Sequence, residues 1–186
     1  MRIANQLAIG IQLGEDALNN LPKSGDTYPL PLPVQSKVSG IDHVEADWNP
    51  SGHEPGPIYG APHFDFHFYY ISKQEQSSVI PGPDTVTVPA QYIPTDYVTG
   101  VFAVPNMGVH WSDTTAPEFH GVPFTTTFIY GFYHGKMTFL EPMVTKAFLQ
   151  THPDFLHPSN NRLLFSKAII ILPGTRFNMM PPNTFI

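Results

Sequence analysis

Polar and apolar side chains alternate along residues 63–70, which read His-Phe-Asp-Phe-His-Phe-Tyr-Tyr. Successive side chains of a β-strand point to opposite faces, so this segment predicts a strand with two different faces. One face would carry His63, Asp65, His67 and Tyr69, and the other would carry aromatic residues that can pack in a core. We therefore expect one strand to contribute both to the core and to a row of polar groups.

The rest of the chain also indicates short strands joined by turns. Its 21 prolines are spread along 186 residues, which leaves little room for long helices. Further strands are predicted over residues 3–13, 41–48, 97–104 and 163–172, with a hairpin of residues 125–132 and 136–141 around His134-Gly135.

Two short helices are predicted, over residues 15–21 and 142–150, the second with Pro142 at its first position. No internal repeat and no domain boundary is evident. The predicted fold is one mainly β domain over residues 1–186, a single-domain β-barrel or sandwich with one or two short helices.

Composition narrows the classes of function. Charged residues make up 13% of the chain, against roughly 25% in ordinary soluble domains, which is consistent with a surface covered by another subunit. The net charge of -6 and the nine scattered basic residues argue against nucleic acid as a partner. The absence of cysteine excludes disulfides and thiolate metal ligands.

The sequence also bears on membranes and compartment. No apolar run approaches the roughly 20 residues of a membrane-spanning helix, so no membrane span is expected. Residues 1–6 lack the apolar core of a signal peptide. The protein is expected to be extracytoplasmic if a signal peptide was removed and cytoplasmic otherwise.

A local excess of acids and histidines points to a bound cation. Residues 38–72 contain five Asp or Glu and four His but no Lys or Arg. Such a stretch favours a divalent transition metal, zinc foremost, because imidazole and carboxylate groups are its ligands. The alternative is a solvated acidic loop whose histidines are hydrogen-bonded.

Strand geometry limits how many of these groups can share one ion. Residues two apart on a strand are separated by roughly 6.6 Å and residues four apart by roughly 13 Å, whereas a Zn–N bond is about 2.0–2.1 Å. Without a bulge, His63 and His67 cannot bind the same ion. Other ligands must therefore come from elsewhere, and the full candidate set is His53, Glu54, His63, Asp65, His67, His110 and Glu141.

Two of the remote candidates have other interpretations. His110, in Gly108-Val109-His110-Trp111, could equally be a histidine of the core. Glu141 could be an acid that caps the predicted helix at residues 142–150. If a metal is present, Glu54 or Asp65 could act as a general base on a metal-bound water.

Several motifs together resemble one known family. They are Trp48-Asn49-Pro50-x-Gly52-His53-Glu54-Pro55 and residues 62–69, 108–111, 127–131 and 139–143. They are similar to a family of uncharacterised bacterial domains typified by a homodecameric Thermus thermophilus protein under the control of a sigma-E/anti-sigma-E system. The resemblance covers about residues 9–149, and residues 150–186 diverge. It implies a β-rich fold, homo-oligomerisation and an envelope-stress context, but no reaction.

Three functions follow as hypotheses. The first is a metal-binding domain, with or without enzymatic activity. The second is a non-enzymatic oligomeric structural or stress protein whose histidines and acids form a hydrogen-bond network. The third is a module that binds a small molecule in a pocket lined by Trp48, Tyr59, Tyr69 and Trp111.

Overall fold

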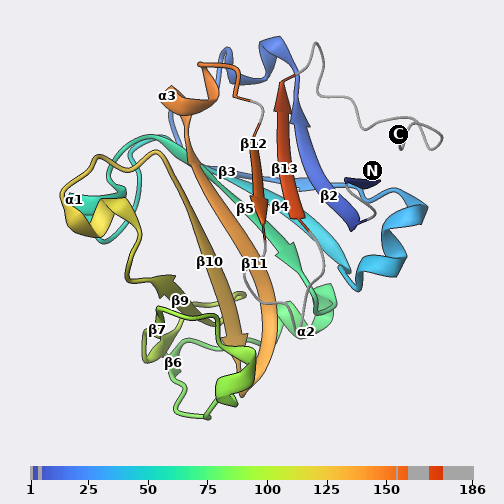
Figure 1. Cartoon of the computed structure of the whole chain (residues 1–186), viewed down its shortest axis with the longest axis vertical. Helices are drawn as coiled ribbons and strands as arrows, with labels where there is room; N and C mark the ends of the chain where they lie inside the picture. Colours follow the sequence, from blue (N-terminus) through green and yellow to red (C-terminus); the bar gives the residue numbers. More distant parts are fainter. Residues whose placement is uncertain (1, 4–5, 154, 159–167, 174–186) are drawn as a thin grey trace.

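A seven-stranded antiparallel sheet forms the centre of the computed structural model, which describes residues 2–3, 6–153, 155–158 and 168–173 (Figure 1). Its strand order is β3-β4-β5-β11-β10-β9-β7, and β3 and β7 form open edges, so the sheet does not close on itself. The predicted mainly β class is confirmed. The strands are β3 (Asp26–Leu30), β4 (His43–Asn49), β5 (His63–Tyr69), β7 (Tyr97–Thr99), β9 (Val109–Asp113), β10 (Thr126–Tyr133) and β11 (Lys136–Thr145).

Two smaller sheets accompany the large one. The four-stranded sheet has the order β1-β2-β13-β12, and the two-stranded sheet pairs β6 with β8. The predicted strand at residues 97–104 is divided between β7 and β8, while residues 163–167 of the last predicted strand lie outside the described residues. The strands are β1 (Arg2–Ile3), β2 (Gln6–Leu13), β6 (Gly82–Pro83), β8 (Phe102–Ala103), β12 (Phe155–Pro158) and β13 (Ala168–Pro173).

The helices are all short, and three α-helices are described where one or two were predicted. They are α1 (Gly56–Tyr59), α2 (Lys73–Ser77) and α3 (Lys146–Leu149). The described residues also form four short 3₁₀ helices, η1 (Glu15–Leu18), η2 (Val34–Ser39), η3 (Ala90–Tyr92) and η4 (Pro117–His120). None of the helices in the described ranges is long and apolar enough to cross a membrane.

The prediction that Pro142 begins a helix was wrong. Pro142 lies inside β11, opposite Phe128 of β10. The ladder between β11 and β5 has no pair between Leu140 and Met143, which accommodates a proline that cannot donate a hydrogen bond. The helix α3 begins only at Lys146, and its N-cap is the hydroxyl of Thr145.

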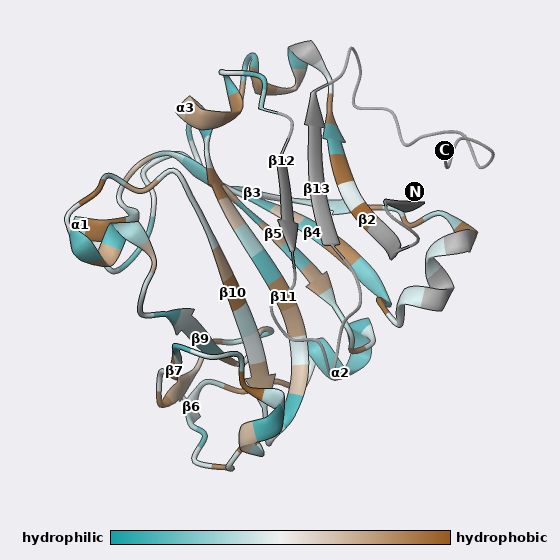
Figure 2. Cartoon of the chain, viewed as in Figure 1, coloured by the Kyte–Doolittle hydropathy of each residue, from teal (hydrophilic) through white to brown (hydrophobic). Residues whose placement is uncertain are grey.

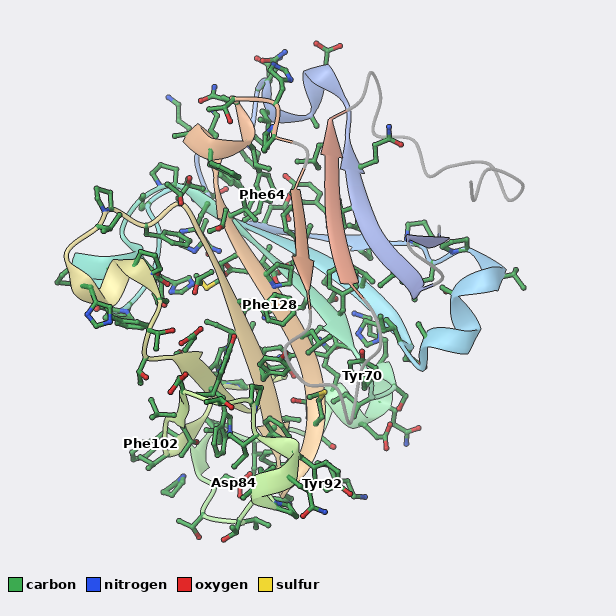
Figure 3. All side chains as sticks on the ribbon, in the orientation of Figure 1. Phe64, Tyr70, Asp84, Tyr92, Phe102 and Phe128 are labelled. Carbon is green, nitrogen blue, oxygen red and sulfur yellow. The ribbon has the colours of Figure 1, made fainter. Side chains whose placement is uncertain are left out.

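The large sheet has one apolar face and one mixed face, as the alternating pattern of β5 predicted. Brown and teal segments alternate along its strands in Figure 2. Ile11 and Leu13 of β2 belong to the same buried cluster as Phe64 and Phe128, which Figure 3 labels, so β2 covers the apolar face. Every residue of β5 is buried, because its other face is covered as well.

The hairpin of β10 and β11 closes with the predicted two-residue turn. His134 (φ 48°) and Gly135 (φ 76°) both adopt the left-handed conformation, as a tight hairpin turn of this length requires. The hairpin carries a register shift between Gly131 and Phe132. This register places Phe139 directly opposite Gly131.

We expect Gly131→Ala to destabilise the protein by about 1–3 kcal/mol through overpacking. A Cβ atom at Gly131 would lie 2.0 Å from Cε1 of Phe139, whose ring is fully buried and cannot move freely. Urea unfolding measures the change, with Gly100→Ala as a control because its Cβ would meet no atom closer than 3.6 Å. Equal losses in the two variants would contradict this packing.

Candidate metal centre

Four structural elements bring histidines and carboxylates together on the mixed face of the sheet. His63, Asp65 and His67 project from β5, with exposed fractions of only 0, 5 and 1%. Glu141 of the neighbouring strand β11 is equally buried, at 2%. His110 comes from β9, and His53 comes from the loop that precedes β5.

These side chains form two separate groups. The Asp65 group consists of His53, His63 and Asp65, and the Glu141 group consists of His67, His110 and Glu141. In each group, one potential ligand atom per residue lies within 4.8 Å of the others. Each group could therefore hold a metal ion. His63 and His67 belong to different groups, in agreement with their separation of four residues along β5.

In the Asp65 group, two histidines approach different oxygens of one carboxylate. His63 Nε2 lies 3.1 Å from Asp65 Oδ1, and His53 Nε2 lies 3.2 Å from Asp65 Oδ2. The side-chain amide of Asn49 donates to Oδ2 at 2.8 Å and fixes the carboxylate. His63 Nε2 and Asp65 Oδ1 are both buried and have no hydrogen-bond partner among the described residues.

The Glu141 group repeats this arrangement with longer distances. His67 Nε2 lies 3.5 Å from Glu141 Oε1, and His110 Nε2 lies 3.5 Å from Glu141 Oε2. In the described part of the chain, His67 Nε2 and Glu141 Oε2 are likewise buried without a hydrogen-bond partner. Each group therefore contains an imidazole nitrogen and a carboxylate oxygen that lack partners.

The opposite ring nitrogens are held by hydrogen-bond acceptors. Nδ1 of His53 lies 2.8 Å from the carbonyl of Glu54, and Nδ1 of His63 lies 2.7 Å from the carbonyl of Ala61. Because a carbonyl only accepts, each Nδ1 carries the proton, and in the neutral ring the lone pair lies on Nε2. Both Nε2 atoms face the carboxylate of Asp65, as in metal sites whose histidines are oriented by a second hydrogen bond.

His67 is oriented by a carboxylate instead of a carbonyl. Its Nδ1 lies 2.7 Å from Asp47 Oδ2, and the other oxygen of Asp47 accepts a hydrogen bond from the hydroxyl of Thr27. This carboxylate–histidine pair makes Nε2 of His67 a stronger ligand. His110 makes a hydrogen bond to the backbone of Gly108.

Aromatic rings fix the histidine planes further. The ring of Phe139 meets His67 and His110 edge to face, at centroid distances of 5.0 and 5.1 Å. Phe124 meets His63 in the same way at 5.4 Å. The position of Phe139 therefore sets the relative orientation of the two histidines in the Glu141 group.

A compact loop carries His53 to the sheet. Gly52 has a φ of 66°, and a Cβ atom there would lie 2.1 Å from the carbonyl oxygen of Tyr59, so only glycine fits. The backbone N–H of His53 donates to that same carbonyl at 3.2 Å. Glu54 instead accepts a hydrogen bond from the N–H of Gly56 at 2.7 Å, and it belongs to neither group.

The mutual influence of these groups appears in their pKa values. The hydrogen bond with Asp65 raises the pKa of His53 to about 9. Burial lowers the pKa of His67, but the charge of Glu141 and the hydrogen bond with Asp47 outweigh it and raise the pKa to about 9. Burial raises the pKa of Glu141 to about 8, although the charge of His67 opposes this shift.

The pKa values of His110 and Asp65 are lowered instead. Burial and the charge of His67 lower the pKa of His110 to about 4. Burial alone would raise the pKa of Asp65, but the neighbouring imidazoles of His53 and His63 outweigh it and hold the pKa well below its usual range. In the metal-free cluster, the raised pKa values of His53, His67 and Glu141 all favour bound protons, which lower the negative charge of the cluster.

Both groups open into one cleft of about 810 Å³. Its walls include carboxylates but no Lys or Arg among the described residues, and one side is apolar, with Phe102, Val104, Met107 and Ile129. Phe102 is labelled in Figure 3 near the β6–β8 pair. The carboxylates in the lining are Asp26, Asp47, Glu54, Asp65 and Glu141. Of the four aromatics predicted to line a pocket, only Trp48 and Tyr59 line this cleft.

The structure thus brings together six of the seven candidate ligands and leaves out Glu54. His110 lies in the cluster, half-buried, and Glu141 is not a helix cap, since it lies inside β11 and the cap of α3 is Thr145. Two residues with supporting roles were not predicted, Asp47 and Asn49. They lie on the same face of β4, opposite Asp65 and His63, so pairing these two strands would have found them.

No protein-family model, curated protein or solved structure matches the chain. The resemblance to the sigma-E-controlled bacterial family therefore stays a prediction. The two groups are defined by the geometry of this chain alone.

We expect the metal-free protein to lose stability as the pH rises from about 6.5 to about 9. The pKa values of His53, His67 and Glu141 are raised to about 9, 9 and 8 from ordinary values of 6.5, 6.5 and 4.5. The folded state therefore binds more protons than the unfolded state in this range, and the free energy of unfolding decreases with pH. Urea unfolding of chelator-treated protein across this range measures the trend, and a rising stability would contradict it.

Proposed function

We propose that the protein binds a divalent transition metal ion, zinc foremost, at the Glu141 group. The observation that carries this proposal is the burial of Glu141 beside the Nε2 atoms of two histidines. The described lining of the cleft contains no Lys or Arg that could neutralise its carboxylate. An ionised carboxylate in such a place is strongly unfavourable unless a cation or a hydrogen-bond donor compensates its charge.

The distances favour an ion over direct hydrogen bonds. Two ligands that each lie about 2.0–2.1 Å from a tetrahedral zinc ion are themselves about 3.4 Å apart. The two His–Glu distances in this group, one to each oxygen of the carboxylate, are both 3.5 Å. A hydrogen bond between a protonated histidine and a carboxylate would be shorter, about 2.7–2.9 Å.

Three protein ligands give the site its chemical character. Zinc ions with three protein ligands keep a fourth position for water or a bound molecule, whereas purely structural zinc ions usually have four protein ligands. His67, His110 and Glu141 all line the cleft, so the fourth position is expected to face it. The ion would supply Lewis-acid chemistry there, and the small-molecule hypothesis takes the same cleft as its binding site.

Homo-oligomerisation and a role in envelope stress are proposed on the family resemblance. A group of exposed apolar side chains in one short segment supports a protein partner, because exposed apolar surface often marks an interface. It is formed by Val98, Val101, Phe102 and Val104, which are 54, 57, 63 and 40% exposed.

Untagged protein is expected to contain at least one zinc equivalent per chain after reconstitution, measured by inductively coupled plasma mass spectrometry. Chelation should lower the melting temperature, because the ion binds only the folded state. Glu141→Gln should weaken zinc binding by at least about 100-fold, since it removes a charged ligand.

Glu54→Gln is the matched control, because Glu54 lines the same cleft outside both groups. Its zinc affinity should stay close to that of the wild type. Protein that binds no metal and melts at the same temperature with and without chelator would favour the hydrogen-bond network instead.

Asp47→Ala should weaken zinc binding by about 10- to 100-fold, because Asp47 orients His67 without touching the ion. Competition with a chromogenic chelator measures the affinity. Asp26→Ala removes another carboxylate of the cleft that contacts no histidine of the cluster, and it should have a smaller effect. If Asp47→Ala and Asp26→Ala weaken zinc binding equally, Asp47 contributes only its negative charge and not the orientation of His67.

A further inference from the structure

We propose that the Asp65 group binds a second divalent metal ion, separate from the ion at the Glu141 group. This inference rests on the proposed metal binding and extends it from one ion to two. It concerns His53, His63 and Asp65, which meet at the edge of the cleft where the loop before β5 folds back.

The contact between His63 and Asp65 leaves two buried polar atoms without a hydrogen-bond partner among the described residues. His63 Nε2 and Asp65 Oδ1 are 3.1 Å apart, but they are not aligned for a hydrogen bond, and no other described residue serves them. The proton of the neutral His63 ring is on Nδ1, where it is donated to the carbonyl of Ala61. Two buried lone pairs that face each other repel, and a cation that binds both removes the repulsion.

His53 completes a three-ligand set. Its Nε2 lies 3.2 Å from the other oxygen of Asp65, and its ring meets that of His63 edge to face at 4.7 Å. Its Nδ1 is held by the carbonyl of Glu54. The set of two Nε2 atoms and one carboxylate has the same composition as the Glu141 group and suits the same class of ion.

One ion cannot serve both groups. His63 and His67 are four residues apart on β5, a spacing of roughly 13 Å, whereas metal–ligand bonds are only about 2.0–2.2 Å long. Each group also has its own pair of unpartnered buried atoms, His63 Nε2 with Asp65 Oδ1 and His67 Nε2 with Glu141 Oε2. An ion bound in one group would leave the buried pair of the other group without a partner.

The charges around the cluster are compatible with two divalent ions. Asp65 and Glu141 contribute two negative charges as ligands, and Asp47 contributes a third behind His67. Two divalent ions bring four positive charges against these three, and Asp26 and Glu54 add two further carboxylates to the lining of the cleft. Within the described lining, the cleft has no Lys or Arg to compete with the ions.

Metal counting in wild-type protein, two single variants and the double variant that combines them tests this inference. His53 and His110 are the most exposed ligands of their groups, with side chains 37 and 26% exposed, so His53→Gln and His110→Gln carry the least risk of misfolding. Untagged protein is stripped with chelator, reloaded with Zn²⁺ or Co²⁺, desalted and analysed by mass spectrometry. Circular dichroism confirms folding, and His120→Gln serves as a control outside both groups.

The expected result is two ions per chain in the wild type and the control, one in each single variant and none in the double variant. One ion that persists in His53→Gln and disappears in His110→Gln overturns this inference but keeps the proposed function. One ion that both variants abolish also overturns it, because a single ion would then span the cluster. No ion in any protein overturns the proposed function itself.

A second readout does not depend on the variants. An anomalous difference map at the zinc edge, from crystals of reloaded wild-type protein, should show two peaks, one beside Asp65 and one beside Glu141. A single peak contradicts the inference even if a variant fails to fold.

Discussion

The burial of carboxylates without basic partners is the constraint on which this site depends. Asp65 and Glu141 lie on adjacent central strands, where burial makes an uncompensated negative charge very unfavourable. Lysine or arginine would be the common solution, and none lines the described cleft. Histidines lie beside the carboxylates instead. Hydrogen bonds to a carbonyl or a carboxylate orient the rings of His53, His63 and His67. The negative charge of the cluster is therefore offset by protons on imidazole or on Glu141, or by metal ions.

The buried carboxylates and the hydrophobic core lie on opposite faces of the large sheet. The apolar face of the large sheet packs its aromatic residues with β2, and the other face carries the charged cluster. Phe139 connects the cluster to the surrounding packing, because its ring lies against both His67 and His110 while its own position is limited by Gly131. The histidines are consequently held by packing as well as by hydrogen bonds.

The sequence predicted what depends on local pattern and missed what depends on pairing. The alternation of polar and apolar residues predicts β5 and its polar face, and strand spacing alone separates His63 from His67. Asp47 was not recognised as a partner of His67, because their contact depends on how β4 pairs with β5. Pro142 was assigned to a helix because proline is common at helix starts and rare in central strands. Its place in β11 is tolerated only because the ladder to β5 is interrupted there, which a local pattern does not reveal.

The absence of Lys and Arg from the described lining of the cleft also determines the form in which a metal would arrive. The five carboxylates that line the cleft give it a negative potential, which attracts a hydrated cation and speeds its capture at low ionic strength. The same potential repels a metal already complexed by an anionic chelator such as a polycarboxylate. The protein would therefore compete for the free aqueous ion and not for its anionic complexes, so its metal content would follow the pool of uncomplexed ions.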